Sequence, residues 1–502
     1  MSMFATKSIE QLKIEAGEVG EHSFKRVLGP VNLVTMGIGG IIGTGIFVLV
    51  GQAAALYAGP GIVLSLALGG LVAGLAGLCY SEFAAAVPLA GSAYTYGYAT
   101  LGEFMAWFIG WNLVLTYALG AAIVSVGWSG RVTSFLDDFV GINLPASLQN
   151  APCTLVNAVG CSPDAVFNLP AAIIAVLVTM LVIIGIKESA NVNAVVVIIK
   201  VVVVMVVILG GAAYVNYANW VPFVPPNTGE FGSYGWSGVV RGAGAIFFAY
   251  VGFDAVSTAA QEAKNPQRDM PIGILGSLVI CTFLYIPVAL VMVGLVPYKA
   301  MLGSAAPMVV ALRAGEAAVG GSRILHSMTM LVELGAIAGL TSVMVVYMIA
   351  MPRILYTMAK DGLLPPIAKK IHPKFRTPHV SSVLTGVVVM LAGAFTPVAV
   401  LGELVGIGTL LAFLIVSVGI IFLRYQRPDL ERPFKVPFVP VVPAISALVC
   451  LALMVGLPWD TWKRLLVWSA IGIAVYFVYG ARHSELRKRN EALAAAGGSE
   501  RQ

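Results

Sequence analysis

The chain has 502 residues, of which 59% are hydrophobic and only 11% are Asp, Glu, Lys or Arg, and its mean hydropathy is +0.91. A soluble domain has roughly 25% charged residues, so this composition excludes a soluble enzyme or binding domain and indicates a polytopic membrane protein. The net charge of +6 indicates basic loops that face anionic lipid, and not nucleic-acid binding.

A polar leader of roughly 27 residues comes first, and the apolar segment that follows it is too long for a cleavable signal peptide. Twelve apolar segments are long enough to cross a bilayer as helices. The sequence therefore predicts an all-α polytopic membrane protein with twelve transmembrane helices. The segments lie at about 31–55, 61–87, 101–128, 168–186, 192–215, 238–260, 272–296, 327–353, 379–397, 399–423, 438–457 and 464–480.

The first segment contains an unusual run of five glycines between Gly37 and Gly45. Each glycine costs about 1 kcal/mol of helix propensity relative to alanine. Non-helical backbone is tolerated at membrane depth only where protein or a water-filled cavity surrounds it. Freed amides suit an anion and freed carbonyls suit a cation, so a break here fits an α-amino acid. Close packing of helices through small residues is the alternative.

The sixth segment is also interrupted, because Gly242, Gly244 and Gly252 accompany Asp254 at membrane depth. The two interrupted segments occupy corresponding places in two halves of five helices, and an odd number of crossings gives the halves opposite orientations. This arrangement predicts a five-plus-five inverted repeat with discontinuous helices 1 and 6 and a midplane site. We expect a leader at 1–27, repeats at 28–216 and 217–424, peripheral helices 11 and 12 at 425–481, and a tail at 482–502.

The distribution of lysine and arginine predicts the orientation. If the leader is cytoplasmic and the segments alternate, 22 of the 30 basic residues fall inside, 7 fall outside and Lys200 lies within the membrane. This asymmetry predicts that both termini are cytoplasmic. The outside set is Arg131, Arg241, Lys299, Arg313, Arg323, Lys463 and Arg464.

Two external features follow from this orientation. The loop between segments 3 and 4 contains Cys153 and Cys161, which would form a disulfide in an oxidising compartment. The short, mildly amphipathic stretch Met308–Ala318 is predicted as an interfacial helix and not a span. The remaining cysteines lie in apolar segments and are expected in the core: Cys79, Cys281 and Cys450.

Five pieces of the chain match, in order, a known family of transporters. They are Gly39–Phe47, Tyr80–Glu82 through Gly91–Tyr96, Phe247–Asp254, Asn265–Pro271, and Arg353–Tyr356 with Asp361–Pro365. With them the chain resembles the amino acid–polyamine–organocation (APC) superfamily, closest to the cationic amino acid transporter branch and its bacterial members. The resemblance covers about residues 25–480 and implies an inverted-repeat fold that moves amino acids by alternating access.

The resemblance also implies where the substrate binds. Backbone amides of the first break would meet the substrate carboxylate, and carbonyls of both breaks would meet its ammonium. Because these are backbone contacts, they select the α-amino-acid head and not the side chain. Thr116 stands where some bacterial relatives have glutamate, so both a substrate contact and a wholly structural role stay open for it. The amides are near Gly43, Thr44 and Gly45, and the carbonyls belong to Ile41, Phe248, Ala249 and Val251.

Lys200 lies in mid-span, where an ammonium costs roughly 2.5–3.5 kcal/mol. In proton-coupled bacterial relatives, a lysine at this place fills the position that sodium takes in sodium-coupled ones. We therefore expect protonated Lys200 to bond carbonyls near Gly40 and the hydroxyl of Thr341 or Ser342, and deprotonation to release this tie. The alternative is a lysine whose ammonium reaches the cytoplasmic interface.

Other charged residues suggest contacts inside the bundle. Asp254 and Glu333 are interpreted as a side-chain contact or proton relay, with helix capping or loop tethering as the alternative. A polar network at the inner gate is expected from Glu82, Glu262 and Arg268, with plain solvation of loops as its alternative.

Together with these residues, the resemblance implies proton-coupled transport of an L-amino acid across the plasma (bacterial inner) membrane, the substrate being either cationic or small and neutral, such as arginine or alanine. An exchanger without net proton movement and a transport-inactive sensor are the alternatives. The chain has no mid-span His pair, Ser–His arrangement or metal-ligand spacing, so we expect no enzyme activity, metal or cofactor. The expected partners are the amino acid, protons and membrane lipid, and the sequence identifies no small single-span partner protein.

Overall fold

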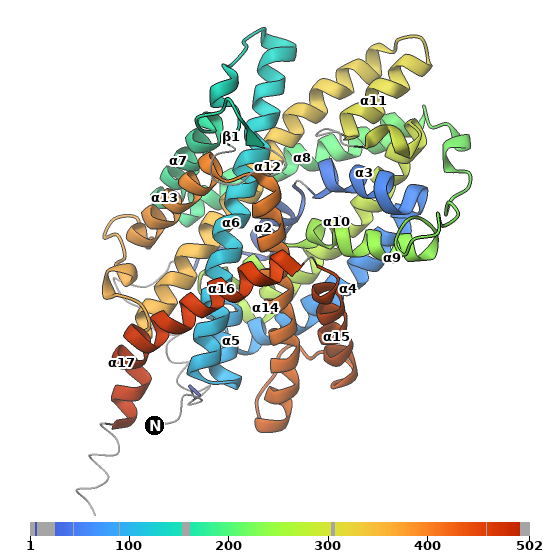
Figure 1. Cartoon of the computed structure of the whole chain (residues 1–502). Helices are drawn as coiled ribbons and strands as arrows, with labels where there is room; N and C mark the ends of the chain where they lie inside the picture. The colour runs from blue at the N-terminus through green and yellow to red at the C-terminus, as the bar shows by residue number, and fades with distance from the viewer. Residues whose placement is uncertain are drawn as a thin grey trace, which may run out of the picture.

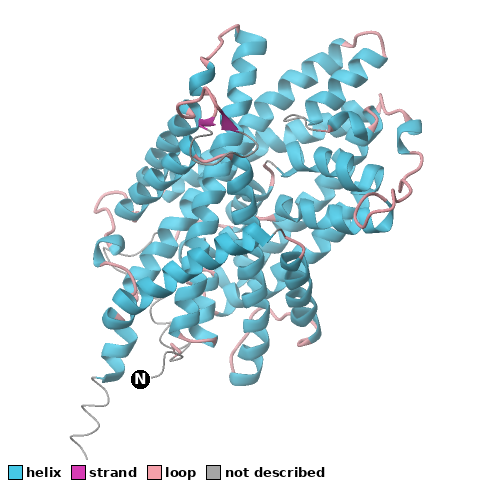
Figure 2. Cartoon of the chain, in the orientation of Figure 1, coloured by secondary structure: helices cyan, strands magenta, loops and turns pink. Residues whose placement is uncertain are grey.

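The computed structural model describes residues 6–7, 26–43, 45–89, 91–152, 161–302, 307–457 and 459–491. Most of this part is helical, as Figure 2 shows. The strands β1 (Ala151–Pro152) and β2 (Cys161–Ser162) pair in parallel and form a two-stranded sheet in the loop before the helix α7. The expected helical architecture is therefore confirmed, while the twelve spans and the inverted repeat stay predictions.

The long helices account for most of the chain. Within the described residues, seven helical stretches are long and apolar enough to cross a membrane, and four apolar helices are shorter. The main helices run in the order α2 (Pro30–Ile41), α3 (Val50–Ala53), α4 (Ile62–Ala86), α5 (Ala93–Thr100), α6 (Glu103–Phe135), α7 (Leu169–Ile184), α8 (Ile186–Ala212), α9 (Gly235–Ile246), α10 (Pro266–Leu295), α11 (Pro307–Ala318), α12 (Arg323–Lys360), α13 (His379–Phe395), α14 (Val398–Gln426), α15 (Val441–Val455), α16 (Trp459–Val475) and α17 (Ala481–His483).

Short helical turns connect or extend these helices. They are η1 (Gly45–Leu49), η2 (Ala54–Ala58), η3 (Gly59–Gly61), η4 (Leu136–Val140), η5 (Ala146–Leu148), η6 (Tyr217–Trp220), η7 (Phe247–Tyr250), η8 (Asp254–Glu262), η9 (Tyr298–Met301), η10 (Pro366–Lys369) and η11 (Tyr476–Gly480).

Both glycine-rich segments are broken, as the sequence predicts. The first helix stops at Ile41, where Ile42 is already extended, and helical structure resumes at Gly45. In the second glycine-rich segment, which is the sixth apolar segment of the chain, α9 ends at Ile246. The short helices η7 and η8 replace the continuation of α9. Glycine-rich sequence thus ends regular helix where the surrounding helices can satisfy the freed backbone groups.

Of the helices that lead into the breaks, α2 lies near the middle of the bundle and α9 lies at its side (Figure 1). The helix α10 packs against both α2 and α4, while α12 packs against α6 and α8, and α14 packs against α6 and α15. The last long helix is attached to α6 by paired indoles: Trp111 donates to the carbonyl of Trp468 at 2.9 Å, and Trp468 donates to the carbonyl of Trp111 at 3.1 Å. Their stacked rings lie 4.6 Å apart, so α16 is attached at its middle and crosses the front of the bundle in Figure 1.

The structure also describes the predicted short helix and most of the cysteines. The stretch predicted as a short helix is α11, which begins at Pro307 and ends at Ala318. All three cysteines of the apolar segments are buried, as predicted. Cys153 and the side chain of Cys161 lie outside the described residues, as does most of the leader. The disulfide therefore stays a prediction.

Candidate functional site

The two helix breaks touch each other directly. Gly252 has a φ of +121°, and a Cβ atom there would lie 2.6 Å from the carbonyl carbon and oxygen of Gly40. On the other side, a Cβ atom on Gly45 would lie 2.4 Å from Ala249. The residues expected to bind the two ends of an amino acid head therefore come together at one place. Thr44 lies outside the described residues, and Gly43 is buried beside Val343.

Tyr285 of α10 joins the two breaks and was missed by sequence reasoning. Its hydroxyl lies 2.9 Å from the carbonyl oxygen of Ile41 and 3.1 Å from that of Ala249, and it donates to them. These are two of the carbonyls expected to meet a substrate ammonium. In this structure, therefore, a protein hydroxyl occupies the place between them. A buried tyrosine in an apolar helix gives no sequence signal of such a role.

Lys200 ties α8 to the end of α2. Its side chain is 0% exposed, and its ammonium donates to the carbonyls of Gly39 and Ile42, both at 2.9 Å. It also donates to the hydroxyl of Ser342 at 3.1 Å. The side chain is fully buried and does not reach an interface. Thr341 and Ser342 were the two candidate acceptors for the ammonium. The Thr341 hydroxyl instead donates to the carbonyl of Ile337 in its own helix.

Asp254 and Glu333 each fasten another helix to α6. The Asp254 carboxylate accepts a hydrogen bond from the Tyr117 hydroxyl at 2.6 Å and one from the Gly252 amide at 3.2 Å. Glu333 of α12 forms an ion pair with Arg131 at 3.6 Å. The hydrogen bond between Asp254 and Tyr117 holds the second break against α6. The ion pair between Glu333 and Arg131 joins α12 to α6.

Thr116 has an ordinary packing environment. Its hydroxyl donates to the carbonyl of Asn112, one turn earlier in α6, at 3.0 Å. A Cβ atom on Gly408 of α14 would lie 2.3 Å from that hydroxyl oxygen, so the two helices cross closely here. These contacts attach Thr116 to its own helix and to α14, and the substrate contact expected for it stays a prediction.

Each of the three residues expected in the inner-gate network has contacts of its own. Glu82 accepts from Arg424 at 2.9 and 2.8 Å and pairs with Arg432 at 3.2 Å. Glu262 pairs with Arg353, and Arg268 lines a cavity at the surface. The loop from Arg432 to Val436 contacts Glu82 and also lines the cavity at Arg268. A shared gate network stays a prediction.

A further cluster of polar side chains surrounds α5, and the sequence analysis did not predict it. Asp361 accepts hydrogen bonds from Lys7 and from the Tyr94 hydroxyl, both at 2.5 Å. Burial and the nearby Asp361 carboxylate raise the pKa of Tyr94 well above its usual value, so the phenol stays a donor. Glu103 accepts from Tyr98, Tyr476, Ser484 and Arg487. The first and last described segments of the chain therefore meet at α5.

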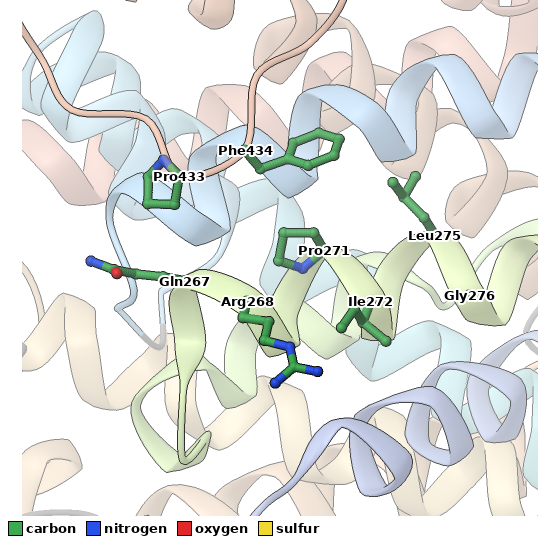
Figure 3. Close-up of a pocket in the computed structure, with 8 residues that line it drawn as sticks. All are labelled: Gln267, Arg268, Pro271, Ile272, Leu275, Gly276, Pro433 and Phe434. Carbon is green, nitrogen blue, oxygen red and sulfur yellow. The ribbon is translucent and has the colours of Figure 1, made fainter.

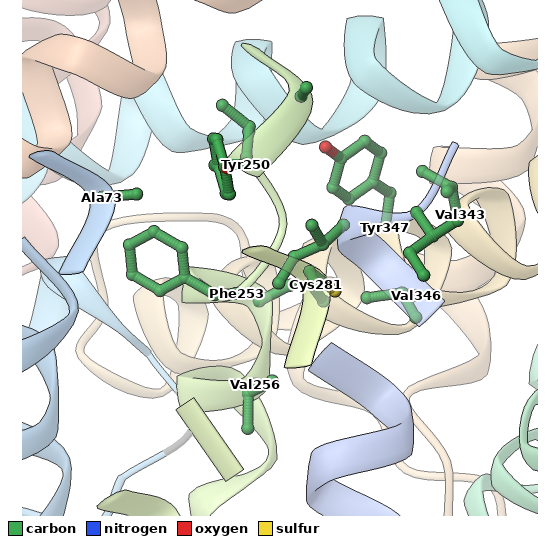
Figure 4. Packing of buried hydrophobic residues seen from close by; sticks show 14 of the residues in the cluster. Ala73, Tyr250, Phe253, Val256, Cys281, Val343, Val346 and Tyr347 are labelled. Atoms are coloured by element: carbon green, nitrogen blue, oxygen red, sulfur yellow. The ribbon is translucent and has the colours of Figure 1, made fainter. Parts of the chain in front are cut away.

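The walls around the breaks are apolar and aromatic. Figure 4 shows some of these side chains: Phe253 and Val256 of the second broken segment, Cys281 of α10, and Val343 and Tyr347 of α12. All of these side chains are buried. Apart from the polar groups of Lys200, Ser342, Tyr285 and Asp254, the side chains drawn around the breaks are apolar or aromatic.

A family model described as amino acid permease matches residues 28–478. The chain belongs to the amino acid permease family. This assignment covers both breaks, Lys200 and the ion pairs described above, and it makes the protein a multi-pass membrane transporter and not an enzyme. It agrees with the resemblance that the five sequence pieces indicate.

Relatives of this permease differ in the substrates that their names give. The branched-chain amino acid permease BcaP of Bacillus subtilis is 44% identical over 97% of this chain and 99% of its own length. The methylthioribose transporter of the same organism is 43% identical over 97% of this chain and all of its own length. The vacuolar cationic amino acid transporter 4 of Arabidopsis thaliana is 36% identical over 85% of this chain and 68% of its own length.

We expect Tyr285→Phe to change how the permease responds to substrate. The variant loses the donor between the Ile41 and Ala249 carbonyls, and a buried acceptor without its donor costs about 1–3 kcal/mol. A substrate ammonium at the same carbonyls would restore part of that loss, so added substrate should raise the unfolding temperature more in the variant than in the wild type. Thermal unfolding with and without leucine or alanine measures this difference.

Tyr234→Phe is the matched control for this experiment. Its hydroxyl also donates to a backbone carbonyl, that of Ala55 at 2.6 Å, and neither residue belongs to a break. The control should lose some stability but keep the wild-type shift with substrate. Equal substrate shifts in both variants would contradict a role of Tyr285 at the binding carbonyls.

Proposed function

We propose that this permease imports a neutral L-amino acid together with a proton. The observation that carries the proposal is the bonding of Lys200, whose ammonium holds the Gly39 and Ile42 carbonyls that flank the first break. Loss of a proton from the ammonium would remove one of the donors that bind these carbonyls and the Ser342 hydroxyl. The end of α2 would then be freed from α8, which links proton release to movement of the break.

The apolar walls favour a neutral side chain over a cationic one. A buried cationic side chain needs an opposite charge beside it. Among the described residues, the buried carboxylates Glu82, Glu262 and Glu333 already pair with arginines. Asp254 faces the Tyr117 hydroxyl and the Gly252 amide. The name of the Bacillus subtilis branched-chain permease supports the same class of substrate.

The proposal includes the membrane topology that the sequence predicts. We place twelve spans in the chain, with repeats at 28–216 and 217–424, peripheral helices at 425–481 and both termini in the cytoplasm. Support comes from the two breaks, which lie in the first and sixth segments and contact each other at Gly40 and Gly252. Substrate would bind at that contact and be exposed to each side in turn.

Transport by purified protein in liposomes tests this function. With an imposed inward proton gradient, we expect leucine or alanine to accumulate, and a protonophore to abolish the accumulation. Lys200→Ala should lose gradient-driven accumulation. Lys463→Ala removes an exposed ammonium on α16 and should behave like the wild type.

Three results would overturn parts of the proposal. Uptake that ignores the gradient but requires internal amino acid would make the protein an exchanger. Accumulation of labelled arginine or methylthioribose instead of leucine and alanine would overturn the substrate class. Binding of amino acid without any movement of label would make it a sensor.

A further inference from the structure

A cavity of about 700 Å³ lies beside the first turns of α10, apart from the helix breaks. Pro433 and Phe434, from the loop between α14 and α15, face Pro271 and Leu275 of α10 across it, as Figure 3 shows. The Arg268 guanidinium lies beside Ile272 in the same view. The cavity thus has apolar walls and a basic group at one end.

The basic group is available for a ligand. Arg268 is exposed, and within the described part of the chain its guanidinium forms no ion pair. The neighbouring carboxylate of Asp269 is buried and accepts from the backbone amide of Asn265 at 3.2 Å. On the facing loop, exposed Glu431 and Lys435 offset each other in charge. Arg268 therefore gives the cavity a net positive end.

The cavity continues into a strip of α10 that faces outward. Ile272, Val279 and Phe283 are 40%, 53% and 74% exposed, and their spacing places them on one face of the helix. Gly276 lies between them without a side chain. In a membrane protein, such exposed apolar side chains face lipid tails. From Arg268 to Val279 the helix rises about 16 Å, which is close to half of a ~30 Å hydrocarbon core.

We propose that this cavity binds an anionic phospholipid, with the phosphodiester at Arg268 and an acyl chain along Ile272, Gly276 and Val279. Guanidinium groups bind phosphate oxygens in a bidentate manner, and the apolar walls fit the glycerol backbone and the first methylenes. One end of the site thus recognises charge and the other recognises hydrocarbon. The proposal goes beyond amino acid transport and does not depend on it.

Native mass spectrometry of the full-length protein in detergent tests this site. Phosphatidylglycerol and phosphatidylcholine with identical acyl chains are titrated separately. We expect the first bound lipid to be held about fivefold more tightly when it is phosphatidylglycerol, as ~1 kcal/mol for one basic residue near an anionic group implies. Arg268→Gln should abolish that preference.

Two further variants separate the possible causes. Lys264→Gln removes an exposed charge that does not line the cavity and should keep the preference. Phe434→Ala should weaken binding of both lipids alike. The proposal is overturned if Arg268→Gln keeps the preference, if Lys264→Gln loses it equally, or if inorganic phosphate at equal concentration displaces the lipid.

Discussion

Gly252→Ala is expected to abolish amino acid uptake and to lower the thermal stability of the permease. A side chain at a φ of +121° costs about 1–3 kcal/mol. The added methyl would also overlap the backbone of Gly40, at 2.6 Å, and overpacking costs a further ~1–3 kcal/mol. The overlap is relieved only if the two breaks separate, and then the Tyr285 hydroxyl could no longer bridge the carbonyls of Ile41 and Ala249.

Gly74→Ala is the matched control for this substitution. Gly74 lies within α4, and apart from the backbone of its own helix and its chain neighbours no heavy atom is within 4 Å of the added carbon. Alanine inside a helix is better than glycine by about 0.5–1 kcal/mol, so this variant should be as active as the wild type and at least as stable. Initial uptake rates and unfolding temperatures of both variants measure the difference. Wild-type uptake by Gly252→Ala would show that the contact between the breaks is not required.

The helix breaks could be predicted because their signal is local. Five glycines in nine positions between Gly37 and Gly45 oppose a helix wherever the chain folds, and the structure has its break there. An ammonium in mid-span must find acceptors, but which helices supply them for Lys200 was implied only by the resemblance to transporters with a lysine at this place. The choice between Thr341 and Ser342 could not be predicted, because it depends on how α12 is rotated.

Pairings between distant helices were the part that the sequence could not supply. The sequence does not show that Glu82 and Glu262 are buried. It also does not show which of several arginines pairs with each of them, because the lengths of the loops allow more than one partner. Tyr285 and Tyr117 lie in apolar segments, where tyrosine usually packs as an aromatic ring with a satisfied hydroxyl. Their acceptors, the Ile41 carbonyl and the Asp254 carboxylate, exist as a site only because both helices are broken.

One junction connects the start of the first broken helix to the end of the second. The amides of Val27 and Leu28 both donate to the carbonyl of Glu262 at 2.9 Å, and the amide of Lys264 donates to the carbonyl of Leu28 at 2.8 Å. The Glu262 side chain extends from the same place to Arg353 of α12. The backbone bonds thus join the two broken segments, and the ion pair joins them to α12. A motion that swings the broken segments away from α12 must break the ion pair.

Removing one partner of this ion pair is therefore expected to destabilise the protein strongly. The Arg353 guanidinium donates to the Glu262 carboxylate at 3.1 and 2.8 Å, and both side chains are buried, at 2% exposure each. A buried charge left without its partner costs about 3–5 kcal/mol. Glu262→Gln and Arg353→Met should each show such a loss in the free energy of unfolding, measured by SDS titration in mixed micelles.

The double variant decides whether the cost comes from pairing or from packing. With both charges removed, no unpaired charge stays buried, so the loss should be clearly smaller than the sum of the two single losses. The exposed pair Lys463–Asp460, at 3.0 Å on α16, serves as the control, and its single variants should change the free energy by less than about 1 kcal/mol. Strictly additive losses at Glu262 and Arg353 would mean that the two side chains stabilise the junction independently. The tie between the broken segments and α12 would then rest on shape and not on charge.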